Sequence, residues 1–84
     1  MTAGSTSPFS LTRIPTLRPE QLVRAIKRAG FVEHGQRGSH LTLKHPIDGR
    51  RTVVPLHGRD VKRSLMRLIM RQCGITESAL RQLL

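Results

Sequence analysis

The sequence contains no tryptophan and no tyrosine, and its only phenylalanines are Phe9 and Phe31. Proteins that bind single strands without sequence preference stack the bases on aromatic side chains, so this shortage argues against such a stacking surface. Cysteine is equally scarce. Cys73 is the only one, which rules out an internal disulfide and fits a reducing cytoplasm. We expect Cys73 to act as a small buried apolar residue.

Long apolar runs are also missing. None approaches the roughly 20 residues that a membrane-spanning helix needs, and the sequence has no basic start followed by an apolar stretch, as a secretory signal would have. We therefore expect no membrane association.

Acidic residues are few: they number 5 against 15 lysines and arginines, which gives a formal net charge of +10. Only Lys27, Lys44 and Lys62 are lysines, so 12 of the 15 basic residues are arginine. The planar guanidinium fits phosphate and carboxylate groups better than an ammonium does. The composition therefore predicts an anionic partner, either a nucleic acid or an acidic protein.

The chain length of 84 residues leaves room for one domain with a thin core. Residues 1–12 are rich in serine and threonine and carry no charged side chain. We predict a flexible tail over residues 1–13 and a folded domain over residues 14–84.

Hydrophobic periodicity predicts helices and strands in a fixed order. A first helix should begin near residues 17–19 and stop at Gly30. The remaining elements are strands at 31–36, 39–45 and 50–56, a long helix at 60–73 and a short helix at 76–84. This order predicts an α+β domain with its helices on one face of a three-stranded antiparallel sheet.

The middle strand has clear alternation, with Leu41 and Leu43 on one face and His40, Thr42 and Lys44 on the other. If the helices cover the leucine face, His40 stands on the open face. For the long helix we expect Asp60 as the N-cap and Gly74 as the stop. Its buried stripe should contain Val61, Leu65, Leu68, Ile69 and Cys73.

A short motif, Gly38-Ser39-His40, follows Arg37 immediately. Imidazole has an unperturbed pKa near roughly 6.5 and can exchange a proton at cellular pH, while a nearby guanidinium can hold a phosphate. Gly38 is suited to a turn or to close approach of the backbone to a phosphate. Ser39 can donate a hydrogen bond to a phosphate or to the turn. Spacing alone favours a surface histidine after a turn over a catalytic role for His40.

Arginines recur every four residues at Arg59, Arg63, Arg67 and Arg71, which would stack them along one side of the long helix. The pattern allows two interpretations, a solvated helix face or a surface that grips a polyanion or an acidic partner.

Of the other histidines, His57 is a candidate for a second proton-transfer role, and Lys44 joins Arg37 as a candidate phosphate ligand. We expect His34 and His45 to be exposed strand residues. The spacings of the four histidines match no usual zinc-ligand set and there is no second cysteine, so no metal site is predicted.

Four blocks of the sequence, taken together, resemble the HicA family of RNA-cleaving toxins from toxin–antitoxin pairs: Ala29-Gly30-Phe31, residues 36–40, Pro55-Leu56-His57 and residues 69–76. The resemblance implies a fold like the double-stranded RNA-binding domain. It also implies a cytoplasmic type II toxin, an endoribonuclease that cuts mRNA without metal or cofactor, with a HicB-type antitoxin as partner. His40 would be the catalytic residue. The expected RNA-binding residues are Arg37, Gly38, Ser39, Lys44, His57, Arg63, Arg67 and Arg71.

Two other functions are compatible with the same residues. One is a noncatalytic RNA-binding or ribosome-associated domain, for which fold and charge suffice and loss of His40 would be tolerated. The other is a protein-binding module whose arginines dock an acidic partner, with little affinity for RNA even at low salt.

Overall fold

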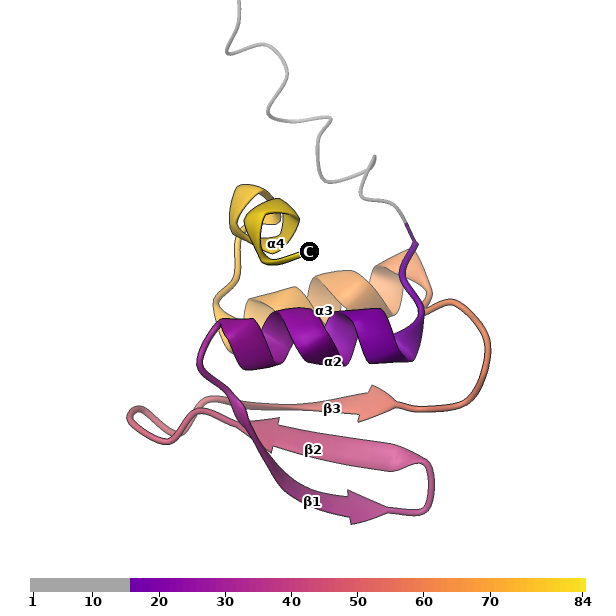
Figure 1. Cartoon of the computed structure of the whole chain (residues 1–84), viewed down its shortest axis with the longest axis horizontal. Helices are drawn as coiled ribbons and strands as arrows, with labels where there is room; N and C mark the ends of the chain where they lie inside the picture. The colour runs from indigo at the N-terminus through magenta and orange to yellow at the C-terminus, as the bar shows by residue number, and fades with distance from the viewer. Residues whose placement is uncertain (1–15) are drawn as a thin grey trace, which may run out of the picture.

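A computed structural model of the chain describes residues 16–84, so the tail predicted over residues 1–13 lies outside the described residues. The elements follow the predicted order (Figure 1). They are α2 (Pro19–Arg28), β1 (Val32–Arg37), β2 (His40–Lys44), β3 (Arg51–Pro55), α3 (Arg63–Cys73) and α4 (Glu77–Leu83). Within this range, no helix combines the length and apolar character of a membrane span.

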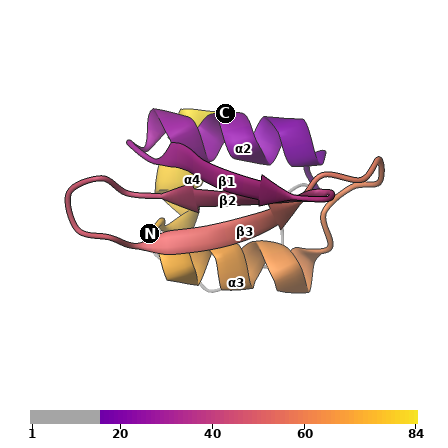
Figure 2. The ribbon, with the colours of Figure 1, turned by 90° about the horizontal axis from the view of Figure 1, so that it is seen from below.

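The three strands form one antiparallel sheet in the order β1-β2-β3, and the helices lie on one side of it (Figure 1). Seen from the opposite side, the sheet is uncovered, with α2 flanking β1 and α3 flanking β3 (Figure 2). This is the predicted α+β architecture, and it agrees with a fold like the double-stranded RNA-binding domain.

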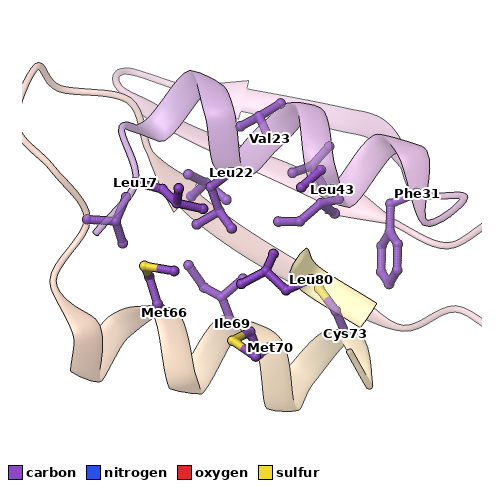
Figure 3. Close-up of a cluster of buried hydrophobic side chains, with 14 of the residues drawn as sticks. Leu17, Leu22, Val23, Phe31, Leu43, Met66, Ile69, Met70, Cys73 and Leu80 are labelled. Carbon is purple, nitrogen blue, oxygen red and sulfur yellow. The ribbon is translucent and has the colours of Figure 1, made fainter. Parts of the chain in front are cut away.

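The core lies between the sheet and the helices (Figure 3). Leu41 and Leu43 of β2 are buried, whereas His40 is exposed, so the predicted alternation along this strand is confirmed. Helix α2 contributes Leu22 and Ile26, which are at most 1% exposed. The apolar side chains of two sheet strands and three helices therefore share one cluster.

The first helix begins where the sequence predicts it. Pro19 occupies its first turn, where no amide hydrogen is needed, and the side chain of Gln21 accepts a hydrogen bond of 3.0 Å from the backbone of Arg18. After the helix, Gly30 takes a positive φ of 102°. Phe31 then packs into the core.

The long helix begins later than predicted, at Arg63 rather than at residue 60, with Lys62 as its N-cap. The reason is a backbone bridge: the N–H of Val61 donates to the carbonyl of Leu17 at 2.7 Å, which keeps this segment extended. The prediction of Asp60 as a helix cap was wrong, and its carboxylate instead accepts a hydrogen bond of 3.1 Å from the hydroxyl of Thr16.

The buried stripe of α3 also differs from the prediction. Met66, Ile69, Met70 and Cys73 are buried, at the i, i+3, i+4 and i+7 spacing of one helix face. Leu68, predicted to be buried, is 43% exposed, and Leu65 is partly buried. Val61 is buried but lies before the helix. The prediction therefore named Ile69 and Cys73 correctly but left out Met66 and Met70.

The end of α3 is fixed by a glycine cap and an arginine. Gly74 takes the left-handed conformation with φ of 68°, as predicted. Arg50 donates to the carbonyl of Cys73 and to the carboxylate of Asp48, and its guanidinium lies over the ring of Phe31, 5.3 Å from the centroid. The Cys73 thiol is buried, which confirms its expected place as a small core residue, and this burial raises its pKa to about 11.

Two neighbouring residues of α3 test the corrected stripe. We expect Ile69→Ala to lower the free energy of unfolding by about 2 to 5 kcal/mol, because it leaves a cavity at a side chain that is fully buried. Leu68→Ala should cost less than about 1 kcal/mol, because Leu68 is half exposed. Urea denaturation of both variants measures the difference, and equal losses would contradict the observed burial.

Candidate active site

The β1–β2 turn places an arginine next to a histidine. Gly38 and Ser39 form a two-residue turn, and Gly38 has φ of 58°, in the left-handed region that such hairpin turns require. Arg37 and His40 are opposite each other as the last pair of the ladder. Directly opposed residues point to the same face with Cβ atoms about 5 Å apart. The guanidinium and the imidazole therefore leave the sheet side by side.

A second histidine reaches the same place from the loop after β3. Pro55 is opposite His40 in the ladder, and the chain leads on to His57. The two imidazole rings are edge to face, with centroids 6.1 Å apart. Both histidines are exposed. Because a hydrogen bond spans about 3 Å, rings at this separation can both contact one phosphodiester.

Lys44 lies on the same open face of the sheet but not beside His40. It is four residues further along β2, about 13 Å away at the usual rise of a strand, and its opposite residue on β3 is Arg51. The row between them, Gly35, Thr42 and Val53, carries no charge. The open face therefore has cations at both ends and a neutral middle, and Arg51 is a member that the sequence interpretation missed.

A groove runs along the edge of the sheet, between β3 and α3. It has a volume of about 360 Å³, and we call it the β3–α3 groove. Its lining residues are His40, Arg51, Thr52, Val53, Pro55, Leu65, Leu68, Ile69 and Gln72. A smaller hollow of about 230 Å³ adjoins it at Pro55 and Leu65 and is lined further by His57, Arg59, Asp60, Val61 and Lys62.

The arginine ridge is shorter than predicted and lies apart from His40. Arg59 precedes the helix and lines the hollow around His57, because the chain is still extended there. Arg63, Arg67 and Arg71 are exposed on α3, but none of them lines the β3–α3 groove. The structure therefore gathers Arg37, His40 and His57 and leaves the ridge on a separate face of the helix.

The remaining two histidines differ in how exposed their side chains are. His34 is exposed on β1, as predicted. The prediction for His45 was wrong, because its side chain is only 15% exposed. Its ring packs edge-on against Phe31 at 5.2 Å, and its Nδ1 accepts a hydrogen bond of 3.3 Å from the backbone of Ile47. Among residues 16–84, no group of three or more histidine, cysteine or acidic side chains is placed to hold a metal ion.

A model of the family described as "HicA toxin of bacterial toxin-antitoxin" matches residues 19–75, from the first residue of α2 to the segment after α3. The chain belongs to the HicA toxin family. It is a toxin of a toxin–antitoxin system, and HicA toxins generally are ribonucleases with a cognate antitoxin. The match covers the hairpin, both histidines of the pair and the arginines of α3. A search of curated proteins found no match.

The conformation of Gly38 is open to test by substitution. We expect Gly38→Val to lower the free energy of unfolding by about 1 to 2 kcal/mol, because a β-branched residue is strained at this positive φ. Gly38→Asn should cost less, because asparagine tolerates the left-handed region. Gly35→Ala is the control, since the space around Gly35 is open and its φ is not positive. Equal stabilities of the valine and asparagine variants in urea would contradict the turn.

Proposed function

We propose that this HicA toxin is a metal-independent endoribonuclease that cuts mRNA in the cytoplasm by acid–base catalysis at His40. The observation that carries the proposal is the meeting of three side chains: Arg37 opposite His40 in the ladder, and His57 with its ring 6.1 Å from that of His40. Arg37 and His40 flank the β1–β2 turn, whereas His57 follows β3, so the approach of His57 to the other two is a product of the fold.

RNA carries its own nucleophile, which explains why so few groups suffice. The ribose 2′-hydroxyl attacks the adjacent phosphorus when a base removes its proton, and the 5′-oxygen leaves when an acid protonates it. Negative charge builds up on the phosphate in between and is stabilised by a nearby cation. Two imidazoles and one guanidinium are chemically sufficient for these three tasks.

The proposed assignment follows from the positions. His40 fills one proton-transfer role and His57 the other, while Arg37 holds the phosphate as its charge increases. The backbone at Gly38 and the hydroxyl of Ser39 lie in the adjoining turn, where they can approach the same phosphate. Lys44, with Arg51 opposite it, would hold phosphates further along the strand, because it is about 13 Å from His40.

One observation favours the second candidate, a noncatalytic RNA-binding domain. Within residues 16–84, the rings of His40 and His57 contact each other, and neither histidine pairs with a carboxylate of the kind that orients many catalytic imidazoles. A basic, open sheet face is sufficient for binding alone. The two functions differ in whether the loss of a histidine abolishes cleavage or leaves only binding.

Cleavage of a long RNA by the purified chain with EDTA present distinguishes the two. We expect His40→Ala to lower the cleavage rate by about 100-fold to 10,000-fold, the usual contribution of a positioned acid or base. His57→Ala should also lower it, whereas His34→Ala is the matched control on β1. If the wild type does not cut, and it and the His40 variant bind RNA equally well, the endonuclease proposal fails and the binding domain replaces it.

The arginines of α3 are tested by the salt dependence of RNA binding. If Arg67 and Arg71 contact phosphates, replacing either by glutamine should reduce the slope of log K against log salt by about 0.7 for a single strand. Arg81→Gln is the control for lost charge, because Arg81 already pairs with Glu77 on α4. The same slope for all three variants would mean that the ridge is a solvated face. Affinity is measured by fluorescence anisotropy over a range of salt concentrations.

A further inference from the structure

The β3 edge of the sheet presents backbone groups that form no backbone hydrogen bond within residues 16–84. The N–H of Leu56 donates to the backbone carbonyl of Ser39 at 2.6 Å, and the N–H of His45 donates to the backbone carbonyl of Arg50 at 2.7 Å. Bonded residues alternate along an antiparallel pair, so residues 50, 52, 54 and 56 bond toward β2. The N–H and C=O groups of Arg51 and Val53, and the C=O of Pro55, therefore point away from the sheet, over a length of about 13 Å.

Beside this edge, the β3–α3 groove offers apolar contacts both on the side of the sheet and on the side of the helix. Val53 is 41% exposed on the open face of the sheet, and Leu68 of α3 is 43% exposed on the helix side. Figure 2 shows α3 alongside β3, beyond the edge of the sheet. Side chains of an extended segment alternate between two faces. A segment paired with β3 would place alternate side chains near Val53 and near Leu68.

The opposite edge of the sheet does not offer the same surface. β1 carries an irregularity between Glu33 and Gly35, and all six of its residues are exposed. Bulges, glycine and charged side chains are the usual means by which an edge strand is protected from pairing. β3 pairs with β2 in unbroken register. The contrast singles out β3 as the edge that can accept a strand.

The charge around the groove indicates which kind of peptide segment would bind there. Arg51 lines the groove, and Arg59 and Lys62 line the adjoining hollow, where Asp60 is the one acidic lining residue. Backbone donors and acceptors in a row favour an extended peptide, whereas cations around them favour one with carboxylates.

We propose that the β3–α3 groove docks an extended, acidic segment of a protein partner, which adds to the sheet as a strand beside β3. His40 lines one end of this groove, and His57 lines the hollow that adjoins it at Pro55, so a docked segment that continues past Pro55 also covers the histidine pair. This last consequence, inhibition of RNA cleavage, rests on the proposed function. The docking itself does not, since it depends only on the backbone edge and the charges.

The test uses a short synthetic peptide that alternates glutamate and valine, added to the full chain and followed by NMR. We expect the amides of Arg51 and Val53 to shift and to become protected from hydrogen exchange. Val53→Pro removes an outward amide without removing a bond to β2, and it should weaken binding about tenfold. The same peptide, N-methylated on alternate amides, should lose binding to the wild-type chain, which provides a second test if the proline variant folds poorly.

Charge and apolar contact are separated by two glutamate variants. Leu68→Glu places a carboxylate in the groove and should weaken the peptide's binding, whereas Ile47→Glu adds the same charge at an exposed residue outside it. Unchanged affinity for Val53→Pro and for the methylated peptide, or shifts confined to the arginines of α3, would overturn strand addition. Protection of the two amides by an RNA oligonucleotide but not by the peptide would also overturn it and assign the groove to RNA.

The two proposals fail separately. A chain that binds the peptide through β3 but does not cut RNA keeps the docking site and loses the endonuclease function. A chain that cuts RNA but shows no protection of Arg51 and Val53 with the peptide keeps the nuclease and loses the docking site. Where both hold, the peptide should inhibit cleavage by the wild type and inhibit the Leu68→Glu variant less.

Discussion

The backbone hydrogen bonds of the central strand β2 hold the rest of the structure in place. They fix the register on both sides, so that Leu41 and Leu43 enter the core while His40 faces outward. A slip of one residue would reverse every side chain of the strand and bury the imidazole. The same ladder sets Arg37 on one side of His40 and leads the chain past Pro55 to His57 on the other. Core and site therefore depend on one set of bonds.

Much of the fold could be predicted from local sequence. The glycines after α2 and α3, the proline in the first turn of α2 and the alternation in β2 each act within a few residues, and each agrees with the structure. The start of α3 could not be predicted this way. It depends on the bridge between Leu17 and Val61, two residues far apart in the sequence. The error over the cap follows from that contact.

The candidate site also combines features that local sequence predicts with features that only tertiary contacts create. The Gly38 turn and its neighbours are local, and the sequence motif located them. The approach of His57 to His40 is a tertiary contact that no spacing encodes, and the role of Arg51 depends on its register opposite Lys44. His45 has the same side chain as His40 but is packed against Phe31, a difference set by the surroundings of each strand end. Side-chain type located the candidates, and only the fold grouped them.

The exposure of β1 has a consequence for the dynamics of the site. All six residues of this strand are exposed, and its cohesion with the domain depends on its ladder with β2 and on the contact of Lys27 with Glu33. Segments with little buried apolar surface open at a lower free energy than the core. Arg37 stands at the end of this strand, whereas His40 belongs to the central one. Fraying of β1 would therefore separate the guanidinium from the imidazole while the core stays folded, and the paired arrangement would be lost at a lower temperature than the domain itself.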